Sequence, residues 1–472
     1  MGSATAVVIT DGALVKSLID KKGAIYNQRP LSYVSYDLIT KGDHVLVMQG
    51  GERWRLTRKT LHQILLESKC ENEHIKLQNA EAAQMLRDIC DAPEDLMLHP
   101  KRYSNSIIVS LLYGIRTSTV RSEHMKDLYE IMDKFSTVME VGAMPPVDIF
   151  PIFKYLPEFL WSNWQTRAKK VNGAMEALYE KMAQHVIDRR TRSGNKGSML
   201  DTVLDQREKF QLSPNAVRFF GGAAMEGGSD TSASMILVFI TAMLKYPEIQ
   251  KKAQAEIDSA VGEDRTPIWS DFNKIPYINM IIKECLRWRP VTPLAFPHAN
   301  SEGNSVSYLM TFQANIVIDD VVDGMHIPKG STVIMNVWGM HMDPVRYPSP
   351  DTFNPENYRG MDLLAADYAV SNRSDKRDHY SYGAGRRICS GIHLAERGMW
   401  LAMAKLLWAF NFVEIEGKPV DVSAETGYTK GLLHCPVDFE CDVQVRSAKK
   451  KDTIMREFEI AQKEIFVKYE EL

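Results

Sequence analysis

The residues of this chain best suited to chemistry lie in one short stretch, 382–391, with the sequence YGAGRRICSG. It holds three glycines and one cysteine, Cys389, directly before an apolar pattern that predicts a helix over 392–410. Glycine permits positive φ angles and lets the backbone approach a flat ligand closely. A cysteine just before a helix N-terminus is favoured as a thiolate, because the helix dipole and free N–H groups stabilise negative charge. The stretch therefore predicts a thiolate ligand.

A thiolate on haem iron pushes electron density towards O–O bond cleavage, so we interpret Cys389 as the axial ligand of a haem. Arg387, two residues earlier, is placed to meet a haem propionate. The alternative is a structural cysteine in a tight turn. The pattern F-x-x-G-x-R-x-C-x-G is met at Gly385, Arg387, Cys389 and Gly391, with Tyr382 in the aromatic place. Four such fixed positions occur by chance at on the order of one in 100,000 start points, which disfavours the alternative.

This stretch resembles the ligand loop of the cytochrome P-450 family, the haem-thiolate monooxygenases. The resemblance covers nearly the whole chain and is greatest to filamentous-fungal members of secondary metabolism. It implies a mainly α fold, with a large helical lobe and a small β-rich lobe, in a single domain over 1–472. It implies haem b as cofactor and insertion of one atom of O2 into a small hydrophobic substrate. Electrons would come from NADPH through an NADPH–cytochrome reductase.

A second motif is Glu284 and Arg287, which share one helix face at i, i+3 and can form an ion pair. In the family, such a pair locks its helix to the loop that precedes the ligand cysteine. That loop is residues 353–358 here, where Asn357 stands in the place of a frequent arginine. Arg359 is the alternative third member of the network.

A third motif is Gly227 and Gly228 inside a long apolar helix. A glycine in a helix interior costs about 1 kcal/mol relative to alanine, so the pair indicates a bend or a close approach. Asp230 and Thr231 follow, and the resemblance implies that they manage protons during oxygen activation. The alternative is a packing kink in which Thr231 bonds its own backbone.

Trp54 and Arg58 form a fourth motif, W-x-x-x-R, on one helix face at i, i+4. It resembles the family's propionate-facing helix, and His298 resembles another propionate contact. The alternative is a surface cation packed on an aromatic ring. The positions that match the family's substrate contacts are largely apolar, which suits a hydrophobic substrate. They are Phe220, Ala223, Ala224, Val291, Thr292, Leu294 and Leu432.

The composition fits a globular protein, with 44% apolar and 25% charged residues in 472. A net charge of -3 provides no electrostatic attraction to nucleic acid. Six cysteines without a C-x-x-C pair are too few for a disulfide scaffold. Apolar periodicity predicts mostly helix over 53–286, with Ser213 capping a helix that begins at Pro214. Short β-branched runs predict strands near 6–9, 45–48 and 332–335.

Two segments depart from the family pattern. The chain begins in what resembles the first β-strand pair, so we expect a truncated gene model or an alternative start. The family is expected at the endoplasmic reticulum membrane, whereas this chain reads as soluble and cytoplasmic. Residues 303–318 hold no charged residue in 16, where the average predicts about four. We interpret them as a retained intron, with a surface hairpin insertion as the alternative.

Two rival functions remain at this stage. One is a haem-thiolate isomerase or dehydratase that acts on a peroxide. Such relatives often lose the acid–threonine pair, so the presence of Asp230 and Thr231 favours the monooxygenase. The other rival is a haem-binding but inactive product of a defective gene model.

Overall fold

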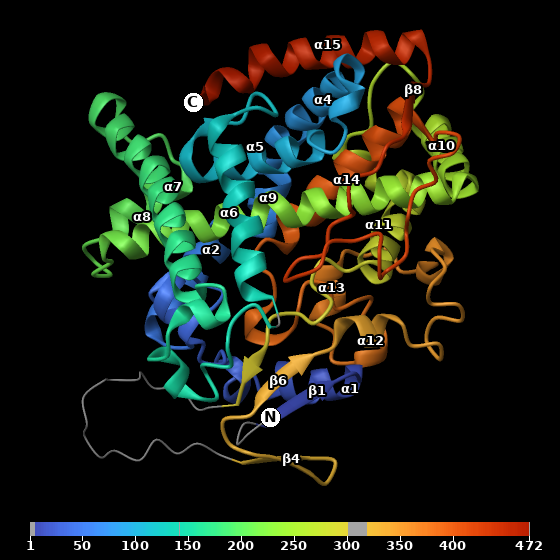
Figure 1. The fold of residues 1–472 in the computed structure, drawn as a ribbon. Helices are drawn as coiled ribbons and strands as arrows, with labels where there is room; N and C mark the ends of the chain where they lie inside the picture. The colour runs from blue at the N-terminus through green and yellow to red at the C-terminus, as the bar shows by residue number, and fades with distance from the viewer. Residues whose placement is uncertain (1–4, 141, 301–318, 472) are drawn as a thin grey trace.

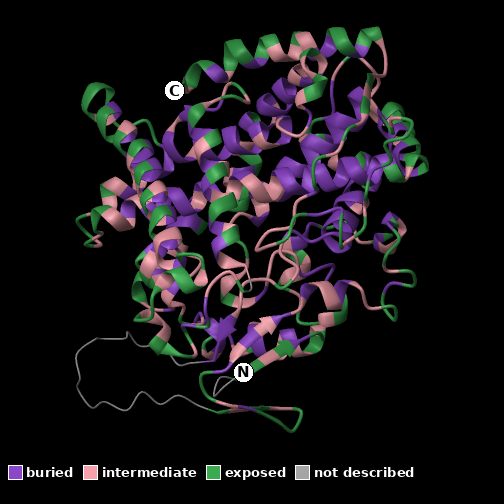
Figure 2. Cartoon of the chain, viewed as in Figure 1, coloured by how far each residue is buried: buried purple, intermediate pink, exposed green. Residues whose placement is uncertain are grey.

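The computed structural model describes residues 5–140, 142–300 and 319–471. The predicted intron or insertion at 303–318 lies outside the described residues. Figure 1 shows a large helical part and, at the end where the N-terminus lies, a smaller part that contains most of the strands. This arrangement confirms the predicted mainly α fold with a small β-rich lobe. Figure 2 shows that buried residues concentrate in the central helices, whereas α15 and one end of α7 carry much exposed surface.

Helices make up most of the predicted helical region 53–286, with the longest gap between α6 and α7. The first eight are α1 (Gly12–Leu14), α2 (Glu52–Ile64), α3 (Glu67–Lys69), α4 (Ile75–Asp91), α5 (His99–Tyr113), α6 (Glu123–Met139), α7 (Trp164–Ser193) and α8 (Met199–Gln206). The others are α9 (Pro214–Lys245), α10 (Pro247–Val261), α11 (Pro276–Trp288), α12 (Val337–His341), α13 (Ala365–Ala369), α14 (Ile392–Ala409) and α15 (Ala448–Glu464).

Helix α9 runs through the middle of the molecule and packs against α5, α7 and α14 (Figure 1). Its predicted start is confirmed, because the Ser213 side chain accepts a hydrogen bond from the Ala216 N–H at 3.0 Å. Pro214 fills the first helical position, where a backbone N–H has no partner within the helix. The helix is long and apolar enough to cross a membrane, but 72% of its most apolar window is buried inside the protein. The protein core therefore accounts for the apolar character of α9.

The glycine pair in α9 has two different surroundings. A Cβ added at Gly228 would lie 2.6 Å from the Ile108 side chain of α5, whereas a Cβ at Gly227 would meet nothing within 4 Å. Gly228 thus permits the close approach of α5 to α9, which was one of the two predicted reasons for the pair. Gly227 faces open space in a cavity described below.

Replacing Gly228 with alanine is expected to lower the free energy of unfolding by about 1–3 kcal/mol, because the new methyl group overpacks the contact with Ile108. Replacing Gly227 with alanine is the matched control. It is expected to raise stability by about 0.5–1 kcal/mol, since alanine is the better helix former and meets no neighbour. Urea unfolding of the two variants checks this, and equal effects would contradict the packing role of Gly228.

The strands form four small sheets. In the first, β6 (Thr332–Met335) pairs in parallel with β1 (Ala6–Ile9) and antiparallel with β3 (His298–Ala299), which confirms the strands predicted near 6–9 and 332–335. The others are the antiparallel pairs β4 (Asp320–Val322) with β5 (Met325–Ile327) and β7 (Phe410–Val413) with β8 (Asp442–Val445), and the parallel pair β2 (Ile115–Arg116) with β9 (Glu470–Glu471).

The strand predicted over 45–48 is wrong. Both Val47 and Met48 donate backbone hydrogen bonds to the His44 carbonyl, at 3.1 and 2.9 Å, so the segment closes into a turn. Its outward carbonyls accept from arginine side chains instead of from a neighbouring strand. Arg29 donates to the Leu46 carbonyl at 2.8 Å, and Arg387 donates to that of Met48 at 2.8 Å.

Candidate active site

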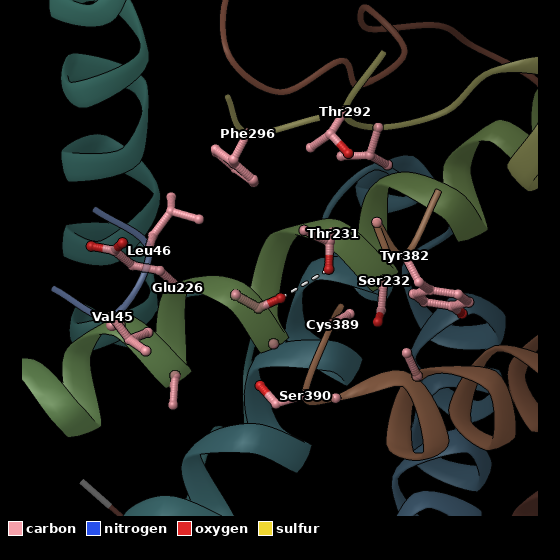
Figure 3. A pocket seen from close by; sticks show the side chains of 18 of the residues that line it. Val45, Leu46, Glu226, Thr231, Ser232, Thr292, Phe296, Tyr382, Cys389 and Ser390 are labelled. Atoms are coloured by element: carbon pink, nitrogen blue, oxygen red, sulfur yellow. Dashed lines mark hydrogen bonds between the residues drawn. The ribbon is translucent and has the colours of Figure 1, made fainter. Parts of the chain in front are cut away.

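A cavity of about 370 Å³ lies between α9, the loop before α14 and the segments 44–46 and 291–298. Figure 3 shows Thr231 on α9 and Cys389 on the loop, both directed into it. The lining is mostly apolar. The predicted site residues that line it are Trp54, Arg58, Ala223, Ala224, Thr231, Val291, Thr292, His298, Tyr382, Arg387, Cys389, Gly391 and Leu432.

Two predicted substrate contacts, Phe220 and Leu294, do not line this cavity. Phe220 lies one helical turn before Ala224, beyond the end of the cavity, in a separate small pocket with Thr60 and Leu212. Leu294 is 52% exposed, because the turn closed by the Ala295 N–H and the Thr292 carbonyl directs its side chain to solvent.

Asp230 and Gly385 also lie outside the cavity lining. Asp230 is one residue before Thr231 and therefore about 100° around the helix, near Tyr129 and Lys101. Burial raises the pKa of Asp230, and Lys101 opposes that shift. Gly385 adopts a φ of +60° and donates its N–H to Asp20 at 2.7 Å, so it shapes the loop from behind.

The loop holds Cys389 through its own backbone. The Cys389 N–H donates to the Tyr382 carbonyl at 2.8 Å, and Arg58 donates to the carbonyl of Ile388. The thiol is accessible from the cavity although protein atoms surround it closely. Burial raises the pKa of Cys389, while the Gly391 N–H and Arg58 act in the opposite direction. The predicted influence of the N–H groups on the pKa of Cys389 is present, but burial outweighs it.

Three arginines gather at one end of the cavity: Arg29, Arg58 and Arg387. In the part of the chain that the structure describes, their hydrogen bonds go to backbone carbonyl oxygens and no carboxylate pairs with them. Arg387 also lies over the Trp54 ring at 4.3 Å. Burial, followed by repulsion from Arg29 and Arg58, lowers the pKa of Arg387 to about 8. Positive charge buried without a counter-charge fits the two propionate groups of a haem.

His298 differs from the arginines in charge. Its Nδ1 lies 2.8 Å from the Tyr26 carbonyl oxygen, to which it can donate only as Nδ1–H. Burial, followed by the charge of Arg29, lowers the pKa of His298 to about 3. A neutral His298 presents an acceptor at Nε2, so the arginines supply the positive charge for a propionate.

The Glu284–Arg287 pair forms as predicted, with N···O distances of 2.7 and 2.6 Å, and both side chains are fully buried. Asn357 donates to both carboxylate oxygens of Glu284 at 3.3 Å. The Asn354 N–H adds a bond of 2.7 Å. Asn357 therefore completes the network as a neutral third member. Arg359 pairs instead with Glu356 at the surface, so the alternative that it substitutes is wrong.

Sequence reasoning missed two charged residues in the cavity wall, Arg29 and Glu226. Arg29 belongs to no motif and reaches the cavity through a segment that precedes α2. One feature of the sequence could have indicated Glu226. It is the single charged residue between Arg218 and Asp230 in the apolar sequence of α9.

Glu396 on α14 was also missed, and it is buried behind the ligand loop. One carboxylate oxygen accepts from the Ala365 N–H at 2.6 Å, and the other has no hydrogen-bond partner among the described residues. Burial raises the pKa of Glu396 from 4.5 to about 7. Because the folded state binds this proton more tightly than the unfolded chain does, stability falls as the pH rises from 4.5 to 7.

Glu396→Gln is expected to remove this dependence on pH. Near pH 5 the variant should match the parent, because glutamine resembles the protonated acid. At pH 8 it should be more stable by about 1–3 kcal/mol, at about 1.4 kcal/mol per unit of pKa shift. Urea unfolding of the haem-loaded proteins at both pH values measures the difference, and an equal effect at both would contradict the raised pKa.

The chain is similar to known proteins in both sequence and fold. Residues 1–438 match the family model described as Cytochrome P450. "Cytochrome P450 monooxygenase patI" of Aspergillus clavatus is 54% identical over 97% of this chain and 83% of its own length. The patI protein of Penicillium expansum is 53% identical over 99% of this chain and 85% of its own. A solved zebra fish cytochrome P450 with progesterone shares the fold, with a TM-score of 0.74 at 21% identity, over 94% of this chain and 95% of that one.

Proposed function

The chain belongs to the cytochrome P450 family, and from that premise we propose which substrate and partners its haem-dependent monooxygenase chemistry uses. As an oxidoreductase of this family, it incorporates molecular oxygen. The substrate is a small, largely apolar organic molecule of fungal secondary metabolism. The electrons come from NADPH through an NADPH–cytochrome reductase. The fungal origin of the relatives supports the setting, and the apolar cavity supports the substrate class.

The observation that carries the site assignment is the cavity with a thiol on its wall and, at its end, three arginines that pair with no carboxylate of the described residues. Cys389 would hold the iron of haem b, and Arg29, Arg58 and Arg387 would hold the propionates. Tyr382, Gly391, His298 and Trp54 complete the walls of the haem site. When bound, the haem supplies the redox chemistry that activates O2.

Thr231 and Asp230 would manage the protons. The Thr231 hydroxyl donates to the Gly227 carbonyl at 2.8 Å (Figure 3), which leaves its oxygen free to accept a hydrogen bond from the cavity. The alternative of a packing kink predicted this hydrogen bond. The bond is compatible both with a packing role and with a role in proton transfer. Asp230 lies behind Thr231, and burial raises its pKa, so it can hold a proton nearer to neutral pH than an exposed aspartate.

The substrate shares the cavity with the haem and occupies the part that the haem leaves free. What remains beside Thr231 is bounded mainly by short or apolar side chains, which favours an apolar molecule. The predicted contacts retained by the geometry are Ala223, Ala224, Val291, Thr292 and Leu432.

Reconstitution with a fungal reductase and NADPH tests this function. Small apolar compounds that shift the haem spectrum are incubated with isotope-labelled O2, and the products are analysed by mass spectrometry. A product that carries one labelled oxygen, formed only with NADPH, is the expected result. A rearranged product formed from a peroxide without NADPH would instead support the isomerase or dehydratase. Haem binding without any product would support the inactive protein.

A further inference from the structure

Glu226 is the only carboxylate among the described residues that line the cavity. Its side chain is 9% exposed, and both of its oxygens already accept hydrogen bonds. The His44 Nε2 lies 3.0 Å from one oxygen, and the Tyr179 hydroxyl donates to the other. Figure 3 shows Glu226 on α9 beside Leu46, with Thr231 and Cys389 further along the cavity. An acceptor group thus stands in a mostly apolar wall.

Both partners are fixed as donors. The Leu46 N–H donates to the Nδ1 of His44 at 3.2 Å, so the ring proton sits on Nε2 and points to Glu226. Burial, followed by the Glu226 carboxylate, raises the pKa of Tyr179 well above its usual value, so its hydroxyl keeps its proton. Each carboxylate oxygen has two lone pairs, and each uses one for these donors. Glu226 therefore retains acceptor capacity.

Glu226 and Thr231 line the same cavity from one helix. They lie five positions apart, a rise of roughly 7.5 Å with a rotation of roughly 140°. Gly227 lies between them with open space at its Cβ position, so nothing from α9 fills the gap. A molecule that contacts Glu226 can therefore extend through the same cavity toward Thr231 and Cys389. An anchored group at one end would place a defined carbon at the other.

We propose that Glu226 is a specificity-determining residue that accepts a hydrogen bond from a hydroxyl group of the substrate, with His44 and Tyr179 as its positioning residues. This inference rests on the proposed monooxygenase function and narrows its substrate class to small apolar molecules with a hydroxyl group. The competing role is a brace that only joins α9 to α7 and to the segment 44–46. A brace would not distinguish a hydroxyl from an ether.

The test is a titration of the haem-loaded protein with 2-naphthol and with 2-methoxynaphthalene, followed by the shift of the haem spectrum at pH 7. The parent protein is expected to bind 2-naphthol about 10- to 100-fold more tightly, the usual effect of a hydrogen bond to a charged group. Glu226→Gln should reduce this ratio to about threefold, because the single amide oxygen is taken by the existing donors.

Glu180→Gln is the matched control. Glu180 on α7 pairs with Arg218 on α9 at the surface, so the change removes the same charge from the same helix pair outside the cavity lining. It should leave the ratio unchanged. A Glu226→Gln protein that weakens both probes equally would overturn the proposal in favour of the brace.

A parent protein without preference for 2-naphthol would also overturn the proposal, and this measurement needs no variant. The red-shifted band of the reduced, CO-bound haem and the NADPH-dependent turnover are recorded for each protein. They report on the monooxygenase function separately, so a parent protein that keeps both but shows no hydroxyl selectivity would overturn the anchor alone.

Discussion

Cys389→Ser is expected to abolish the far red-shifted Soret band of the reduced, CO-bound protein and to reduce NADPH-dependent oxygenation to background. A serine hydroxyl does not ionise near neutral pH, so the variant lacks the anionic sulfur that pushes electron density towards O–O cleavage. The cavity and the arginines Arg29, Arg58 and Arg387 remain, so some haem can still bind. The expected signature is therefore haem with an altered spectrum, and not simply an empty protein.

Cys90→Ser is the control for cysteine replacement in general. Cys90 lies near the end of α4, outside the cavity lining, so it cannot reach a group bound there. This variant should keep both the band and the activity. A Cys389→Ser protein with an unchanged CO spectrum would refute the assignment of the axial ligand.

The ligand loop could be predicted because its constraints are local in sequence. Tyr382, Arg387 and Cys389 fall within eight consecutive residues, and the backbone bond from Cys389 to Tyr382 closes the same short loop. The Glu284–Arg287 pair is local for the same reason, since one helical turn brings the two together. Local patterns of this kind can be recognised in the sequence without knowledge of the tertiary structure.

The remaining parts of the site depend on contacts between distant segments. Glu226 meets His44 from 182 residues away, and Arg29 reaches the carbonyls of Phe296 and Pro297 across more than 260. The spacing of apolar residues along the sequence gives no information on contacts between segments so far apart. The segment 45–48 failed as a strand for the same reason, because its hydrogen-bonding partners are arginine side chains and not a neighbouring strand. Leu294 does not line the cavity because a single turn decides which way its side chain points.

Glu284→Gln is expected to lower the free energy of unfolding by about 3–5 kcal/mol, because it leaves the Arg287 guanidinium buried without its counter-charge. Asn357 is neutral and cannot replace that charge. Arg287 also donates to the carbonyls of His341, Pro350 and Thr352, so the pair connects α11 to the loop that leads towards the haem site. Loss of the pair should therefore reduce haem retention together with stability, and urea unfolding with the CO spectrum measures both.

Two further substitutions measure how much other residues contribute to the stability of the same network. Asn357→Ala removes the hydrogen bonds to Glu284 at 3.3 Å and should cost about 1–2 kcal/mol. Arg359→Ala removes only the exposed pair with Glu356 and should cost less than about 1 kcal/mol. The predicted order separates a neutral third member at 357 from a charged one at 359. If Arg359→Ala were as damaging as Glu284→Gln, the arginine would hold the network after all, and the role given to Asn357 would fall.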